Sequence, residues 1–161
     1  MRPYYYHIYA LLIGMFLITY TAMAQPKTVR FDQLESLQNG ENRIIAIFIY
    51  SQWCKYCTAM KQSTFNQTEI KELLNNKFYF AMLDAEEKQP ITWRGTTFQY
   101  KPTGVNTGVH ELALQLGADA GEASYPILVF LNTQFEIIYQ QKGFIAARDL
   151  EKILKTLSVS L

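Results

Sequence analysis

Long apolar runs alternate along this chain with segments in which apolar residues recur at helical spacing. Uninterrupted apolar runs are typical of strands buried on both faces of a sheet, and they occupy residues 43–50, 78–83 and 126–131, with a further strand predicted over 135–139. Helices are predicted where apolar residues repeat every three or four positions, or where Gly and Pro are missing between strands: 31–39, 54–65, 67–75, 109–116 and 146–157. This order predicts an α/β fold in which a central mixed β-sheet is flanked by helices on both sides.

Residues 85–108 form an insert before the helix that leads to the 126–131 strand. Apolar residues alternate with polar ones between Ile91 and Tyr100, around a turn at Arg94-Gly95-Thr96, which is the pattern of a β-hairpin with Gly95 in its turn. The apolar side either packs on the domain or forms an exposed partner-binding patch. Packing is favoured, because an isolated hairpin is marginally stable. The following residues, 101–108, are predicted to be a loop.

The N-terminal residues 1–24 have the form of a signal peptide. Arg2 precedes an apolar core from Ile8 to Tyr20, and Ala22 and Ala24 then provide an A-x-A cleavage site before Gln25. Cleavage there predicts an exported, periplasmic protein whose soluble domain covers 25–161. An uncleaved membrane anchor is the less favoured alternative, because the apolar segment is at the short end for a membrane span.

Charge excludes some partners. The chain carries 15 basic and 14 acidic residues, and removal of residues 1–24 takes away Arg2 and no acid, so the remaining charges balance. This neutral balance argues against a nucleic-acid partner. The length supports one domain with a proper core, and we expect a monomer.

The only two cysteines stand three residues apart in Trp53-Cys54-Lys55-Tyr56-Cys57, directly after the 43–50 strand. A C-x-x-C pair at a strand-to-helix junction is a redox signature. The helix N-terminus and Lys55 favour a thiolate at Cys54, which is the expected exposed nucleophile. Cys57 lies one helical turn later, within disulfide reach, and is the expected resolving thiol. The pair therefore predicts thiol:disulfide exchange without a cofactor.

Other uses of the cysteines remain open. A closed zinc site needs four ligands, whereas the processed chain offers two Cys and one imidazole, so we expect no structural zinc site. Cuprous ion tolerates two thiolates, which keeps a copper-handling module as an alternative function. An inert disulfide, or a partner-binding module that uses the insert, are the remaining alternatives.

Residues near the cysteines have less specific roles. Trp53 is expected to cover one side of the pair and to offer partners a flat apolar contact, with a plain core tryptophan as the alternative. Tyr56 is expected to face outward and tune access to the thiols, or to be a simple surface aromatic. For His110, in the predicted 109–116 helix, a surface or capping role is favoured over a proton shuttle.

Taken together, these features resemble the thioredoxin family: a buried strand leading into W-C-x-x-C, a helix leading into a Pro-initiated strand, a hairpin, a Gly and a C-terminal helix. The resemblance covers about 31–157 and is closest to secreted bacterial thioredoxin-like proteins and the C-terminal domain of DsbD electron carriers. It implies a thiol:disulfide oxidoreductase whose partners are protein thiols and disulfides, with a membrane electron donor as a candidate. It also implies that the Tyr125–Pro126 bond is cis and that Pro126 packs against the cysteine pair.

The sequence departs from the family pattern in three ways. Many thioredoxins carry a carboxylate within the strand before the cysteines, where this chain has Phe48, so Cys57 is left without an obvious proton acceptor. The dipeptide between the cysteines is Lys55-Tyr56 instead of Gly-Pro. The insert over 85–108 and the stretch from Ala118 to Ser124 exceed the minimal fold.

Overall fold

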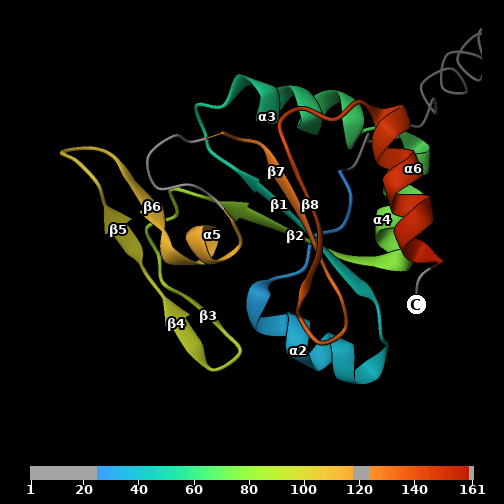
Figure 1. Ribbon diagram of the computed structural model, residues 1–161, viewed down its shortest axis with the longest axis horizontal. Helices are drawn as coiled ribbons and strands as arrows, with labels where there is room; N and C mark the ends of the chain where they lie inside the picture. The colour runs from blue at the N-terminus through green and yellow to red at the C-terminus, as the bar shows by residue number, and fades with distance from the viewer. Residues whose placement is uncertain (1–24, 118–123, 160–161) are drawn as a thin grey trace, which may run out of the picture.

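The computed structural model describes residues 25–117 and 124–159, which form a central sheet with helices on both faces (Figure 1). The helices are α2 (Phe31–Gly40), α3 (Lys55–Ala59), the π-helical turn η1 (Met60–Thr64), α4 (Thr68–Lys77), α5 (Glu111–Gln115) and α6 (Ala147–Ser158). The strands are β1 (Ile44–Tyr50), β2 (Phe78–Asp84), β3 (Ile91–Trp93), β4 (Thr96–Phe98), β5 (Tyr100–Pro102), β6 (Gly108–His110), β7 (Ile127–Leu131) and β8 (Ile137–Lys142).

The central sheet is mixed and has the strand order β2-β1-β7-β8. Strand β1 runs parallel to β2 and antiparallel to β7, which in turn pairs antiparallel with β8. In this register Phe48 of β1 lies between Met82 and Leu128. The predicted α/β class, with a central mixed sheet flanked by helices, is confirmed.

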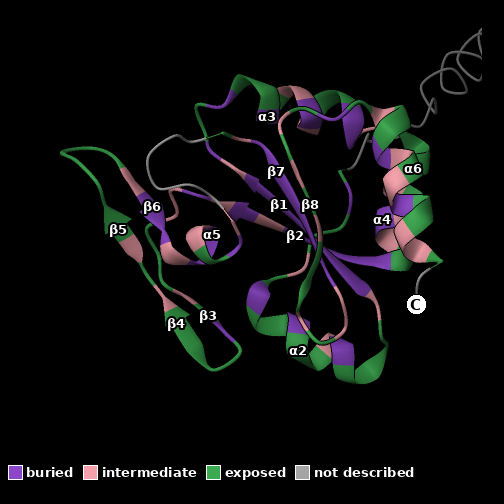
Figure 2. Ribbon diagram, in the orientation of Figure 1, coloured by how far each residue is buried: buried purple, intermediate pink, exposed green. Residues whose placement is uncertain are grey.

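Two apolar clusters cover the two faces of the sheet, and alternate residues of β1 point into one or the other. Ile45, Ile47 and Ile49 join the first cluster, with α2, α5 and the insert. Ala46 and Phe48 join the second, with α3, η1, α4 and α6. Figure 2 shows the buried colour running along the central strands. A strand buried on both faces needs apolar residues at every position, which explains the uninterrupted apolar run over 44–50.

The insert contains two hairpins, whereas the sequence predicted one hairpin and a loop. The first pairs β3 with β4 and turns at Arg94 and Gly95, both at positive φ. Its apolar side packs on the domain as expected: the ring of Trp93 makes edge contacts with Phe31 at 5.7 Å and Phe135 at 5.8 Å. The second hairpin pairs β5 with β6 where a loop was predicted over 101–108. It projects from one side of the molecule in Figure 1.

Several predicted boundaries are wrong by a few residues. The predicted helix 54–65 is split, because α3 gives way at Met60 to the wider turn η1, in which Phe65 N–H bonds to the carbonyl of Met60. The predicted helix 109–116 begins only at Glu111, since the two preceding residues belong to β6. The predicted strand 135–139 lies over Ile137–Lys142, after a turn in which Phe135 has positive φ.

Within 25–117 and 124–159, none of the helices is long and apolar enough to span a bilayer. The predicted signal peptide 1–24, and the alternative of an uncleaved anchor, lie outside the described residues.

Candidate functional site

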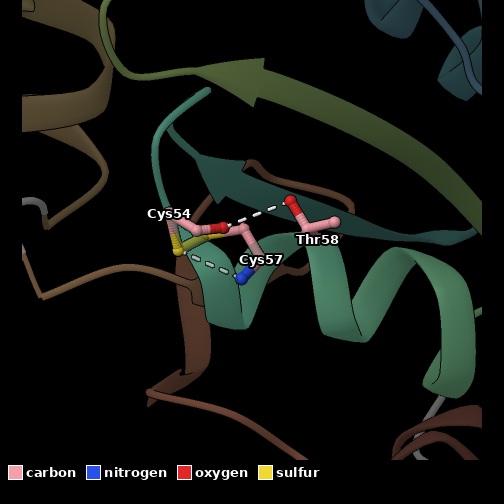
Figure 3. The surroundings of a disulfide bond; sticks show 3 residues. All are labelled: Cys54, Cys57 and Thr58. Atoms are coloured by element: carbon pink, nitrogen blue, oxygen red, sulfur yellow. Dashed lines mark hydrogen bonds between the residues drawn. A yellow bond between two sulfur atoms is a disulfide. The ribbon is translucent and has the colours of Figure 1, made fainter.

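The C-x-x-C motif lies where β1 ends and α3 begins. Cys54 is the N-cap of α3, with an extended backbone (φ −75°, ψ 105°), and its Sγ accepts a hydrogen bond from the Cys57 N–H at 3.0 Å (Figure 3). The Cys54 carbonyl accepts bonds from Thr58 N–H at 3.1 Å and from its hydroxyl at 3.4 Å. The bond from Cys57 N–H places Cys54 Sγ at the start of a helix, where negative charge on sulfur is favoured.

Cys54 and Cys57 are joined in a disulfide, with Cα atoms 5.2 Å apart. The expectation that the two thiols are within disulfide reach is therefore confirmed.

The expected exposure of Cys54 is wrong. Cys54 is 5% exposed and Cys57 1%, and both belong to the cluster formed by α3, η1, α4 and α6. The reason is local: the N-cap side chain turns back toward the first turn of the helix, and its sulfur is bonded to Cys57. Cys54 is the more exposed of the two residues, and its assignment as nucleophile with Cys57 as resolving thiol stays a prediction.

The residues around the cysteines form an exposed aromatic rim. Trp53 is 59% exposed and Tyr56 66%, so Trp53 is not a core tryptophan and Tyr56 faces outward as predicted. The indole of Trp53 donates to Glu86 Oε1 at 3.1 Å, and its ring lies edge-on to Tyr125 at 6.3 Å. Lys55 is exposed. The exposed surface beside Cys54 is therefore formed by two aromatic side chains and by Lys55.

The peptide bond between Tyr125 and Pro126 is cis, as the resemblance implied. Pro126 is buried directly before β7, and its carbonyl accepts a bond from Gly143 N–H at 2.8 Å. Tyr125 packs against the cluster that contains both cysteines. Contact of the Pro126 ring with the sulfurs stays a prediction.

The surroundings of Cys57 are apolar. Phe48 is fully buried in the same cluster, and its ring meets Phe65 edge-on at 4.8 Å and stacks on Tyr50 at 5.8 Å. An apolar environment disfavours a thiolate, so ionisation of Cys57 depends on the charged groups around this cluster.

Hydrogen bonds tie the motif to the start of the insert. Gln52 Nε2 donates to Asp84 Oδ2 at 2.6 Å, and Asp84 Oδ1 accepts the N–H of Glu86 at 3.0 Å. Glu86 in turn holds Trp53. Sequence analysis assigned no role to Asp84 or Glu86. Their position directly after the predicted 78–83 strand was the available signal.

His110 is a buried capping residue instead of a surface residue of a helix. The Nδ1 atom of its imidazole accepts the Leu112 N–H at 3.2 Å and so caps α5. The backbone N–H of His110 donates to the carbonyl of Ala85 at 2.7 Å. Because Nδ1 is an acceptor, the imidazole is neutral in this arrangement. Burial lowers the pKa of His110, and the carbonyl of Gln89 and the charge of Glu87 are the leading influences that oppose this.

We expect a fall in pH from 7 to 5 to destabilise the wild-type protein more than His110→Asn. The pKa of His110 is lowered in the folded state, so its contribution to stability is complete above the unfolded value of about 6.5 and is lost as the pH falls below it. Asn can accept the same Leu112 N–H and does not titrate. Urea unfolding at both pH values measures the difference, and equal losses in the two proteins would contradict this role.

Metal binding finds little support in the described parts of the chain. Within them, no group of three or more His, Cys, Asp or Glu side chains could hold a metal ion. A copper site made of the two thiolates alone stays a prediction.

Comparison with known proteins identifies the fold family. The sequence model of the thioredoxin-like domain matches residues 31–158. Among solved structures, the chain resembles the oxidoreductase DsbH (TM-score 0.59, 16% identity, 88% of this chain and 90% of that one). It also resembles a putative disulphide-isomerase from Bacteroides thetaiotaomicron (TM-score 0.56, 22% identity, 84% and 95%). The C-terminal domain of DsbD from Neisseria meningitidis is similar too (TM-score 0.55, 14% identity, 78% and 90%).

A search of curated protein sequences found no significant match. At these sequence identities the solved structures show the fold alone. The family is shown by the sequence model, which matches most of the chain. The chain therefore belongs to the family of thioredoxin-like domains.

Proposed function

We propose that this protein is an exported thiol:disulfide oxidoreductase that exchanges disulfides with partner proteins through Cys54 and Cys57. The observation that carries the proposal is the disulfide at the start of α3, in which Cys54 is the more exposed of the two residues. The similar solved structures include an oxidoreductase and a putative disulphide-isomerase, which supports the same chemistry. Export rests on the signal-peptide pattern of residues 1–24.

The chemistry needs two exchange steps. In the reduced protein, the Cys54 thiolate attacks one sulfur of a partner disulfide, and the other partner sulfur leaves as a thiolate and takes a proton. Cys57, as a thiolate, then attacks Cys54 Sγ and releases the second partner sulfur. The protein ends with its Cys54–Cys57 disulfide, and the partner has gained two electrons and two protons.

The reverse sequence oxidises a partner dithiol. Its direction depends on the reduction potentials of the protein and the partner. When the protein works as a reductase, a second partner must reduce its disulfide again, and a membrane electron donor is the class that suits an exported protein.

The rim around the cysteines suits a partner segment that presents a cysteine. Trp53 and Tyr56 offer apolar contact on the outside, and Tyr125 continues this surface toward Pro126. Because these groups carry no net charge, contact with them selects for exposed apolar chain more than for a charged surface.

Reduction of insulin disulfides by the purified protein with residues 1–24 removed tests the proposal. We expect Cys54→Ser to lose essentially all thiol-dependent turnover, because serine cannot form the mixed disulfide. Lys152→Met, an exposed change on α6, is the control and should match the wild type. Equal turnover by wild type and Cys54→Ser would refute the proposal.

A further inference from the structure

Opening the disulfide places a negative charge on a buried atom. When a thiolate of a partner attacks Cys54 Sγ, the bond between the two sulfurs breaks and its electron pair stays on Cys57 Sγ. Cys57 is 1% exposed and shares its cluster with Phe48, Met60 and Phe65. Water can solvate this thiolate only poorly, so its stability depends on nearby fixed charge.

Lys61 is placed to provide that charge. It follows Cys57 by four residues, and side chains at this spacing on a helix are neighbours, with Cβ atoms about 5–6 Å apart. Lys61 is the second residue of η1, and the N–H of Met60 directly before it bonds to the carbonyls of Tyr56 and Cys57, so the turn that joins Cys57 to Lys61 is closed by backbone hydrogen bonds.

An aromatic ring fixes the ammonium group of Lys61. Its Nζ lies 3.2 Å from the centroid of the Tyr50 ring, a cation–π contact. Tyr50 is the last residue of β1, stacks on Phe48 and packs against the cluster that contains both cysteines. The ammonium is therefore held beside the cluster instead of extending into water.

The electrostatic surroundings of Lys61 are mixed. Burial lowers the pKa of Lys61, and the charge of Asp84 on β2 opposes this effect. Burial raises the pKa of Tyr50, with the charges of Asp84 and Glu87 acting in the same direction. Tyr50 thus stays neutral near pH 7, and a neutral ring leaves the lysine charge available to the sulfur.

We infer that Lys61 is a positioning residue for the redox site: its ammonium, held on the Tyr50 ring one turn after Cys57, stabilises the thiolate that forms on Cys57 when the disulfide opens. This inference rests on the redox function proposed above and deepens it. A stabilised thiolate favours the reduced form and makes Cys57 a better leaving group. Lys61 would therefore raise the reduction potential of the couple.

The effect has a defined pH window. At a pH below the pKa of the thiols, the disulfide and the dithiol are both uncharged. The charge of Lys61 then favours neither the oxidised nor the reduced form. Once Cys57 ionises in the reduced form, the charge favours reduction. At a pH above the lysine's own pKa the ammonium loses its proton, and the effect fades.

The test compares wild type with Lys61→Met and Lys61→Gln, which remove the charge, and with Lys61→Arg, which keeps it. Equilibration with thiol–disulfide buffers from pH 5 to pH 9 gives the reduction equilibrium constant. Above pH 7 we expect the uncharged variants to favour the disulfide about tenfold more than wild type, a potential lower by about 30 mV. At pH 5 we expect the uncharged variants and wild type to have the same reduction equilibrium constant. Lys61→Arg should follow wild type, and so should Lys152→Met, which removes an exposed charge on α6.

The outcomes separate the two hypotheses. A shift of equal size at every pH would mean that Lys61 acts through packing, and would overturn the inference. Wild-type potentials in both uncharged variants would overturn it as well, while leaving the redox function intact if insulin reduction still depends on Cys54. If wild type and Cys54→Ser reduce insulin equally, the proposed function fails, and this inference fails with it.

Discussion

We expect Cys57→Ser to accumulate as covalent complexes with its partner proteins. Cys54 is the more exposed of the two residues and lies at the start of α3, so we expect its thiol still to attack a partner disulfide. The mixed disulfide then persists, because the thiol that would attack Cys54 Sγ is gone. Expression of the full chain, residues 1–161, followed by non-reducing gels and mass spectrometry, should show adducts that disappear with reductant and that identify the partners.

Two variants control this experiment. Cys54→Ser keeps only the more buried thiol, so we expect far fewer adducts from it than from Cys57→Ser. The double serine variant should form none. More adducts from Cys54→Ser than from Cys57→Ser would reverse the assigned roles, and a lack of adducts from a folded, exported Cys57→Ser would contradict a redox role in that host.

The sheet and the cysteine pair were predictable from sequence because their signals are local. Strand β1 is buried on both faces, so its composition alone is decisive. The C-x-x-C spacing fixes the two sulfurs within one turn whatever the rest of the fold does. The cis bond at Pro126 came from family resemblance, since sequence alone does not distinguish cis from trans.

Other features depend on tertiary contacts and were missed. Strand β5 ends at Pro102, which lacks an N–H to donate, so the second hairpin carries a loop signature. His110 is buried, with Ala85, Gln89 and Phe98 of the insert close to it. The sequence around His110 gives no sign of this burial. The turn η1 likewise carries no distinctive composition.

The charged groups beside the site come from separate elements. Lys61 on η1 meets Tyr50 at the end of β1, and Asp84 on β2 meets Gln52 after β1. The parallel pairing of β1 with β2 sets Tyr50 opposite Asp84, and the separation of these residues in sequence hides it. Sequence analysis noted Phe48 where many thioredoxins carry a carboxylate, but it gave no sign that Lys61 lies on the ring of Tyr50.

Phe48→Ala should cause a large loss of stability, about 3–5 kcal/mol of the free energy of unfolding. The ring is fully buried between helices and sheet, with Phe65 at 4.8 Å and Tyr50 at 5.8 Å, so its removal leaves a cavity. Phe144→Ala is the matched control: that ring is 46% exposed, and we expect a change of about 0.5 kcal/mol or less. Urea unfolding followed by circular dichroism measures both, and similar losses in the two variants would contradict the packing described.

Phe48→Asp extends the same prediction to charge. The carboxylate would enter the apolar cluster around Cys57, where burial raises the pKa of an Asp above its unfolded value of about 3.9. The folded protein would then bind the proton more tightly than the unfolded chain, so the variant should lose stability as the pH rises from 4 toward 7. Phe48→Ala lacks this group and serves as the reference for the pH dependence. A Phe48→Asp protein as stable as wild type at pH 7 would mean that the cluster solvates a charge well. In that case Cys57 would not need Lys61 to ionise.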